Sequence, residues 1–156
     1  MSRRTLIAIA GTVAVLALAA AVLFLPDYLE RAEARRAIAA YNTALTRALY
    51  DVNPELLAQY AHDREMGRVR SYFTELTGRG VFMEADLLAL DIESVTSEGT
   101  TITATTTERW RYVERDSATT RPLGEPIEEE QELVYTLVPR DGDLVVYLSR
   151  LRQENP

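Results

Sequence analysis

The stretch TTERWRYVER combines residue types from which a binding or catalytic site could be built. It holds the single tryptophan of the chain, Trp110, between Arg109 and Arg111. Glu108 precedes these residues and Tyr112 follows them. If the stretch is a β-strand, Glu108, Trp110 and Tyr112 share one face and the two arginines share the other, because side chains alternate along a strand. An inward Glu108 would be a carboxylate among apolar groups, where it could serve as a general acid or base.

Two questions about this strand stay open on the sequence alone. Trp110 either packs in the core or lines a cavity between the sheet and the helices, with Glu108 beside it. Glu108 either does acid–base chemistry or, in the interpretation that we favour, forms an ion pair that fixes a helix to the sheet. Its partner would be one of three helix arginines, Arg64, Arg68 and Arg70. The outward Arg109 and Arg111 would be solvated, or would form a face that recognises an acidic partner.

Other groups that could carry chemistry are few. The chain has no cysteine, which excludes thiolate metal sites and cysteine nucleophiles. Its one histidine, His62, lies at a junction of predicted helices, where a surface or capping role is expected. No HxH, HExxH or calcium-loop pattern occurs, so neither a metal nor a cofactor is expected. The acidic run EEEQE, residues 128–132, is typical of a solvated strand entry and offers weak cation attraction at most.

Three helices are expected upstream of this strand. From 27 to about 52, apolar residues recur at intervals of three and four and so share one helix face. These residues are Ile38, Tyr41, Leu45, Leu49 and Val52. A second, short helix would begin at Asn53 and Pro54, an N-cap followed by a proline at the first helical position. A third covers about 63–78 and is ended by glycine. Its apolar face carries Met66, Val69, Phe73 and Leu76.

After Gly80 the pattern changes to the alternation that is typical of β-strands. The first strand would place three apolar residues on one side, Leu88, Leu90 and Ile92. A threonine-rich second strand carries the TTERWRYVER stretch, and a polar loop over 116–126 leads to the third. The apolar residues of the third strand alternate, at Leu133, Tyr135 and Leu137. Asp141 and Gly142 predict a tight hairpin to the last strand. We therefore expect an α+β fold, with three helices packed on one face of a curved four-stranded antiparallel sheet.

The N-terminal residues 5–25 carry no charge and, as a helix, would span roughly 31 Å, the thickness of a bilayer core. Arg3 and Arg4 precede them, which places the N-terminus in the cytoplasm by the positive-inside rule. We expect a single transmembrane helix in the cytoplasmic membrane, with the rest of the chain outside the cytoplasm. The alternative is a signal peptide over residues 1–21 that is cleaved, which would release the domain as a secreted protein.

These patterns divide the chain into a cytoplasmic tip with the anchor over 1–26, a helical stalk over 27–37 and an extracytoplasmic domain over 38–152. Without Arg3 and Arg4, the exported part holds 15 basic and 24 acidic residues. A surface of that sign repels phosphate backbones, so a nucleic-acid partner is not expected.

The strand pattern E-R-W-R-Y, followed by a loop, the segment YTLVPRDG and a last hydrophobic strand, is similar to a known family. Its residues here are Glu108, Trp110, Tyr112, Tyr135, Leu137, Arg140, Asp141 and Gly142. The helical segments AIAAYNTAL (37–45) and EMGRVRSYFTEL (65–76) fit as well. Together they resemble the nuclear transport factor 2-like (cystatin-like) superfold, and more narrowly the intermembrane-space domains of plastid division proteins and their cyanobacterial relatives. The resemblance covers about 38–151 and implies a curved sheet wrapped around helices, with a pocket.

The resemblance implies a function in binding. In the division proteins such a domain follows a membrane span and binds other proteins, while the wider superfold also includes isomerases, dehydratases and hydrolases. We expect a non-catalytic, membrane-anchored interaction module that binds another envelope protein. The alternative is a domain that binds a small amphipathic ligand in the sheet–helix cavity, and an enzyme is the least expected. The candidate residues of the pocket or helix–sheet contact are Glu108, Trp110, Tyr112 and Tyr135.

Overall fold

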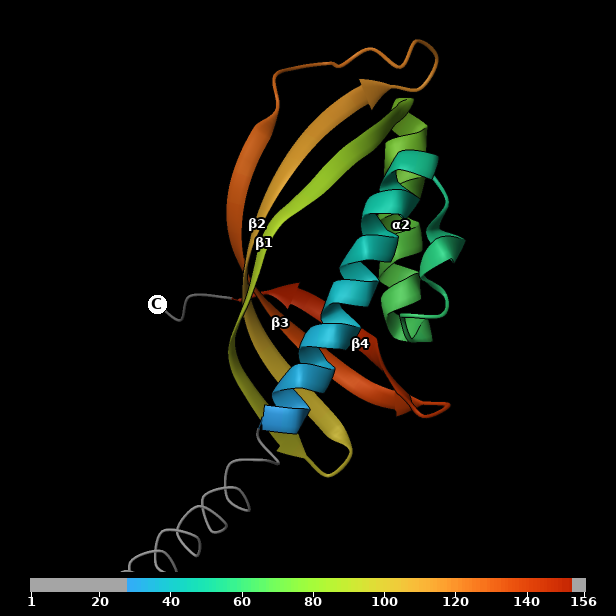
Figure 1. The fold of residues 1–156 in the computed structure, drawn as a ribbon. Coiled ribbons are helices and arrows are strands. Elements are labelled where there is room, and N and C mark those ends of the chain that lie inside the picture. The colour runs from blue at the N-terminus through green and yellow to red at the C-terminus, as the bar shows by residue number, and fades with distance from the viewer. Residues whose placement is uncertain (1–27, 153–156) are drawn as a thin grey trace, which may run out of the picture.

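The computed structural model describes residues 28–152, in which helices cover one face of an antiparallel sheet (Figure 1). The chain runs through an α-helix over 28–51, a short 3₁₀ helix, a second α-helix and then four strands. The predicted α+β class and the four-stranded antiparallel sheet are confirmed. The expected anchor, residues 5–25, lies outside the described residues, and within 28–152 no helix has the length and apolarity to cross a membrane.

The four strands form a meander in the order β1-β2-β3-β4. Their bounds are β1 (Val81–Glu98), β2 (Thr101–Asp116), β3 (Ile127–Arg140) and β4 (Asp143–Leu151). The sheet is strongly curved, and the helices lie on its concave side (Figure 1). At the predicted turn between β3 and β4, Asp141 and Gly142 have positive φ angles of 56° and 93°. Two consecutive positive φ angles are what a type I′ hairpin requires.

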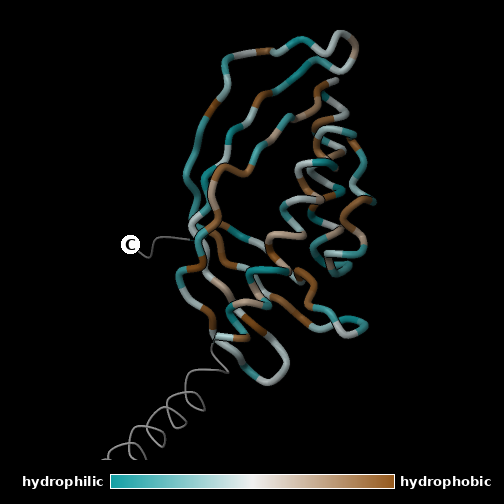
Figure 2. Tube along the Cα trace, viewed as in Figure 1, coloured by the Kyte–Doolittle hydropathy of each residue, from teal (hydrophilic) through white to brown (hydrophobic). Residues whose placement is uncertain are grey.

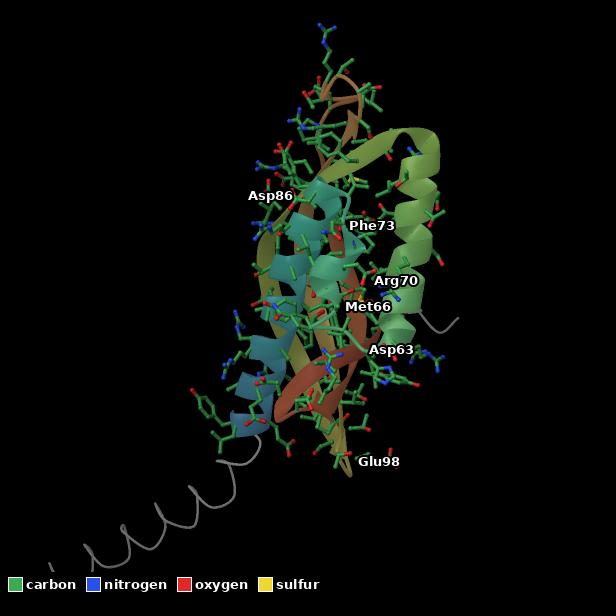
Figure 3. All side chains as sticks on the ribbon, turned by 90° about the vertical axis from the view of Figure 1, so that its right-hand side faces the viewer. Asp63, Met66, Arg70, Phe73, Asp86 and Glu98 are labelled. Atoms are coloured by element: carbon green, nitrogen blue, oxygen red, sulfur yellow. The ribbon has the colours of Figure 1, made fainter. Side chains whose placement is uncertain are left out.

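Both long helices follow the predicted apolar stripes. The helix over 28–51 buries its predicted face, and α2 (Asp63–Arg79) buries Met66 and Phe73 in the core (Figure 3). Gly80 ends α2 in the left-handed conformation, with φ of 68°, and donates its N–H to carbonyl oxygens of the last turn. This is the glycine cap that the sequence predicts.

The second predicted helix is wrong in type. Pro54–Leu57 form a single turn of 3₁₀ helix, η1, and the side chain of Asn53 caps it by accepting a hydrogen bond from the N–H of Glu55. The chain then reaches Ala61, which bridges to Val146 on the outer edge of β4. So short a path from the first helix to the edge of the sheet leaves no room for further helical turns. Among the described residues, therefore, two α-helices and not three cover the sheet.

Strand β1 departs from simple alternation at a β-bulge. Leu87 and Ala89 face consecutive residues of β2, so Leu88 is an extra residue in β1. The bulge leaves Leu88 36% exposed, while Leu90 and Ile92 contact the core. The prediction that Leu88 shares one side with these two residues is wrong, because a one-residue insertion reverses the faces of a strand.

The described part of the expected stalk, residues 28–37, belongs to the first helix and contacts the sheet. Ala34 is fully buried, and the Glu30 carboxylate accepts a hydrogen bond from the Ser97 hydroxyl at 2.9 Å. Arg31 donates to the carbonyl oxygen of Ile92. The beginning of the described helix therefore packs against the end of β1.

Candidate functional site

Strand β2 places the candidate residues on the two faces that alternation predicts. Glu108 is fully buried and Trp110 is 3% exposed, whereas Arg109 and Arg111 are exposed. Tyr112 is half-buried. The inner face of β2 therefore brings a carboxylate and two aromatic rings against the helices.

The Glu108 carboxylate is held by four uncharged donors. Its Oε2 accepts a hydrogen bond from the Trp110 indole N–H at 2.7 Å, and its Oε1 accepts one from the Tyr135 hydroxyl at 2.8 Å. The Asn42 side-chain amide donates to Oε1 at 3.1 Å, and the Thr106 hydroxyl donates at 3.2 Å. These side-chain dipoles stand in for water, and they join the first helix, β2 and β3 at one carboxylate.

The expected ion pair between Glu108 and a helix arginine is wrong. All three candidates bind elsewhere, Arg64 to Tyr147, Arg68 to Glu65 and Arg70 to Glu55. Arg64 and Arg70 occupy exposed positions of α2, so they cannot reach a carboxylate that the core encloses. Uncharged donors from the first helix and the sheet form hydrogen bonds with Glu108 instead.

A second buried carboxylate, Glu65 of α2, lies close to the same region. Its Oε1 accepts hydrogen bonds from the Tyr41 hydroxyl at 2.7 Å and the Ser149 hydroxyl at 2.8 Å, and Arg68 donates to both carboxylate oxygens. The backbone N–H of Ser149 donates to Oε2 at 3.2 Å. Burial raises the pKa of Glu65, but the hydrogen bonds and charge of Arg68, with the hydrogen bonds of Tyr41 and Ser149, outweigh burial and hold the pKa below its usual range.

Tyr41 and Tyr135 connect the two carboxylates. Their rings meet edge to face, with centroids 6.3 Å apart. Burial, followed by the charge of Glu65, raises the pKa of Tyr41, and burial with the charge of Glu108 raises the pKa of Tyr135. Both hydroxyls therefore stay protonated and donate to the carboxylates. Within residues 28–152, every buried side-chain nitrogen and oxygen has a hydrogen-bond partner.

A cavity of about 690 Å³ opens beside this network, between the helices and the concave face of the sheet. Its floor is mostly apolar and includes Leu45, Val69, Phe73, Met83 and Trp110. Three aliphatic residues at its mouth are each more than half exposed, Leu123, Ile127 and Leu151. Glu108 and Tyr135 do not line the cavity. The structure thus separates Trp110, which faces the cavity, from the carboxylate behind it.

Tyr112 and several acidic residues complete the cavity wall. The ring of Tyr112 stacks on Trp110, with centroids 5.9 Å apart and an interplanar angle of 11°. Burial raises the pKa of the Tyr112 hydroxyl, and the nearby charge of Glu129 adds to the effect. Glu114, Glu125 and Glu129 line the cavity, as does Arg68. The cavity therefore combines an apolar floor with a mainly acidic rim.

Arg109 and Arg111 do not form an isolated basic face. Arg111 pairs with Asp86 of β1 at 2.6 Å. On the other side, Arg109 lies opposite Glu130 of β3 and Arg111 lies opposite Glu128. Acidic residues flank both arginines on the same face of the sheet, so this arrangement gives no support to a surface that selects acidic partners.

His62 has a structural role. Its Nδ1 accepts a hydrogen bond from the N–H of Arg64 at 3.3 Å and so caps α2, while its ring lies 4.9 Å from that of Tyr147. The predicted capping role is confirmed. No group of histidine, aspartate and glutamate side chains within 28–152 is arranged to hold a metal ion.

Two members of the buried network are missing from the sequence-based candidates although the sequence marks them. Asn42 follows Ile38 by four residues, and Glu65 precedes Val69 by four, so each is a polar residue within an apolar helix stripe. Such residues, when buried, need hydrogen-bond partners. No local pattern links Glu65 to Ser149, which is 84 residues away in the sequence.

Comparison with known proteins relates the chain to others by structure. No protein-family model matches it, and no curated protein does so. Among solved structures, the intermembrane space region of chloroplast protein ARC6 gives a TM-score of 0.68 at 16% identity, over 78% of this chain and 95% of that chain. A protein of unknown function from Mycobacterium tuberculosis gives 0.51 at 16% identity, over 81% of this chain and 75% of that chain. An Ntf2-like protein involved in plasmid conjugation gives 0.46 at 8% identity, over 66% of this chain and 40% of that chain. The likeness to the intermembrane space region confirms the predicted nuclear transport factor 2-like fold, of the kind seen in the intermembrane-space domain.

Proposed function

We propose that the domain is a non-catalytic binding module whose sheet–helix cavity receives an amphipathic segment of a partner protein. The cavity carries this proposal, because its volume of about 690 Å³ and its mostly apolar floor are typical of binding sites. Leu123, Ile127 and Leu151 gather at its mouth and remain exposed. Exposed apolar residues that cluster in one place mark an interaction surface.

The state of the two buried carboxylates supports a non-catalytic role. Glu108 and Glu65 each accept hydrogen bonds from several donors. Those donors are buried, except for Arg68, which forms an ion pair with Glu65. A general acid or base must reach the proton that it transfers. Trp110 stands between Glu108 and the cavity, so the carboxylate serves to hold the wall of the cavity in place.

A position at a membrane is part of the same proposal. The uncharged segment 5–25 would anchor the module in the cytoplasmic membrane and present the cavity to a partner in the cell envelope. Extraction of membranes with alkaline carbonate tests this, since an anchored chain stays in the pellet. Release into the supernatant would instead favour a cleaved segment and a secreted domain.

An apolar fluorescent probe tests the cavity. In the fragment 27–156, Trp110 should transfer excitation to N-phenyl-1-naphthylamine that binds in the cavity, because the indole is part of the wall. Ile127→Gln at the mouth should weaken this transfer. Leu88→Gln is the matched control, since Leu88 is also an aliphatic strand residue with an exposed surface but does not line the cavity. Equal transfer in both variants would contradict the proposal.

A small amphipathic ligand is the second candidate occupant. The stacked Trp110 and Tyr112 rings offer a flat wall, and Arg68 and Glu129 offer polar groups at its edge. Native mass spectrometry of the purified fragment distinguishes the two occupants. A bound small molecule that Ile127→Gln releases would favour the ligand over a protein segment.

A further inference from the structure

Strand β3 has an open edge beside the cavity. Strand β2 pairs with β3 from Ile127 to Leu137, whereas β4 pairs with it only from Leu133 to Arg140. Within the described residues, the first half of β3 therefore has a neighbouring strand on one side only (Figure 1). Such an edge presents unpaired N–H and C=O groups to which another strand can add.

Among the described residues, no strand pairs with the outward backbone groups of Glu128 and Glu130. The N–H of Arg152, just beyond β4, donates to the carbonyl oxygen of Glu132 at 2.8 Å. Glu132 therefore turns its backbone groups toward the β4 side of the strand. Because this direction alternates along a strand, Glu130 and Glu128 turn theirs to the same side, where β4 does not reach them.

The side chains of this edge are acidic. The segment 128–132 is hydrophilic throughout (Figure 2), and Glu128 and Glu130 are exposed. Arg152 indicates which residue type fits opposite, because its guanidinium pairs with the Glu132 carboxylate at 3.1 Å. Glu130 and Glu128 lie opposite Arg109 and Arg111 of β2 on one side, and basic residues of a strand that continues this line would pair with the same two carboxylates from the open side.

The opposite face of such a strand would meet the cavity mouth, which is apolar except for Glu129 and Gln131. One of its intervening residues would lie opposite Glu129, which lines the cavity, and the next beside Ile127, which is 65% exposed and close to the mouth of the cavity. Leu123 and Leu151 are exposed at the same mouth. Side chains at these positions of the added strand should therefore be apolar.

We infer that β3 accepts an extended segment of a partner protein as an additional antiparallel strand, in which arginine or lysine alternates with apolar residues. The inference rests on the proposed function, since the apolar side chains of this strand are the groups that enter the cavity mouth. A second copy of β3 does not fit, because Glu128 and Glu130 would face their own equivalents and like charges repel across a strand pair. The segment 153–156 of this chain, Gln-Glu-Asn-Pro, contains no basic residue and does not match the pattern.

Backbone methylation of a probe peptide tests the mode of binding. The full chain is held in nanodiscs of zwitterionic lipid, and a short fluorescein-labelled peptide of alternating arginine and leucine is titrated by anisotropy. The arginine N–H groups, opposite Glu128 and Glu130, are those that bond to β3. Methylation of the arginine nitrogens should weaken binding about tenfold or more, as expected for the loss of two hydrogen bonds. Methylation of the leucine nitrogens is the matched control, because those N–H groups point away from β3.

Charge reversal on the protein is the second part of this binding experiment. Glu130→Lys should weaken binding of the unmodified peptide and reduce its dependence on salt. Glu98→Lys is the control, since it makes the same change in net charge at the far end of β1 (Figure 3). Equal affinity for the two methylated peptides, or an equal effect of the two lysine variants, would overturn strand addition.

The two proposals fail separately. If the methylated peptides bind alike while the naphthylamine probe still depends on Ile127, the cavity binds apolar groups but β3 does not accept a strand. If no peptide of this pattern binds, the acidic residues of the edge act only to prevent unwanted strand pairing, which is their common use in proteins.

Discussion

At the scale of single residues, Glu108 organises the interior of the domain. Glu108→Leu would leave the Trp110 indole N–H and the Asn42 amide N–H as buried donors without an acceptor, while the Tyr135 hydroxyl keeps Asn42 Oδ1 as its acceptor. Because each orphaned buried group costs about 1–3 kcal/mol, we expect the variant to lose about 3–5 kcal/mol of unfolding free energy. Tyr135→Phe removes one donor and keeps the acceptor, so its cost should be about 1–2 kcal/mol. Urea unfolding of the fragment 27–156 measures both, and a Glu108→Leu variant as stable as the parent would refute the anchoring role.

Glu65 predicts how stability depends on pH. Its pKa in the folded domain lies below the usual value of 4.5, although burial alone would raise it, because Arg68, Tyr41 and Ser149 favour the carboxylate. A lowered folded pKa contributes stability that is present above the unfolded pKa and is lost as pH falls through the folded pKa. We therefore expect the urea concentration at the unfolding midpoint to decrease as the pH is lowered from about 4.5.

The Glu65→Gln variant provides the comparison for this pH dependence. It should be less stable at neutral pH, since an uncharged amide cannot replace the carboxylate in its bonds with Arg68. Its stability should also change less than that of the parent between pH 6 and pH 3. Parallel pH profiles of parent and variant would show that other groups cause the acid loss.

The sequence predicts these residues only in part. Alternation in β2 places Glu108 and Trp110 inward and Arg109 outward, because that periodicity is a local property of a strand. The partners of Glu108 are not local: Asn42 comes from a helix 66 residues away. An arginine partner is the natural expectation for a buried carboxylate, but uncharged donors from the first helix and the sheet bind Glu108 instead.

At the scale of elements, the bulge in β1 separates residues that the sequence groups together. Leu88 is 36% exposed and Ile92 is 5% exposed. Leu88→Thr should change the unfolding free energy by less than about 0.5 kcal/mol, as surface substitutions usually do. Ile92→Thr should cost about 2 kcal/mol or more, because it removes buried apolar volume and buries a hydroxyl. Thermal unfolding of the two variants checks this. An equal loss of unfolding free energy in both would indicate that Leu88 and Ile92 lie on the same face of β1, as simple alternation predicts.

Turns and caps are predicted from sequence more readily than bulges. Asp141 and Gly142 adopt the positive φ angles that their residue types favour, and Gly80 caps α2 for the same reason. A bulge has no fixed residue signature, since it depends on how β1 follows the curvature of β2. The length of the η1 turn is equally hard to predict from sequence. It depends on the position at which the chain pairs with β4, through the bridge from Ala61 to Val146.

At the scale of the whole molecule, order and composition predict the layers, whereas the pocket is expected only from the family resemblance and from one interpretation of Trp110. The two α-helices and the four-stranded meander follow from periodicity and turn signals along the chain, whereas the third expected helix is a single 3₁₀ turn. The cavity arises because the sheet curves away from the helices while the loop after β2 and the end of β4 close around it. Leu123 and Leu151, from these two segments, have no sequence pattern that assigns them to one site.

Quenching of the single tryptophan reports on this whole arrangement. Trp110 is 3% exposed and faces a cavity whose rim carries Glu125 and Glu129, while Glu114 at the same rim pairs with Arg79. Its emission should be blue-shifted, and neutral acrylamide should quench it more strongly than anionic iodide, because the acidic rim repels anions. Cationic caesium should quench more strongly than iodide, and high salt should narrow the difference between them.

The order of the three quenchers separates the possible positions of Trp110. A tryptophan sealed in a closed core would respond weakly to all of them, and one on the open surface would respond strongly to all of them. Discrimination by charge together with blue-shifted emission indicates a cavity with an acidic rim, because an indole on an acidic surface would emit at longer wavelength. An occupant of the cavity should then protect Trp110 from acrylamide and caesium together, because both reach the indole through the same mouth. If a bound peptide protects the indole from caesium alone, it has neutralised the rim without entering the cavity, and the proposed site of apolar contact is wrong.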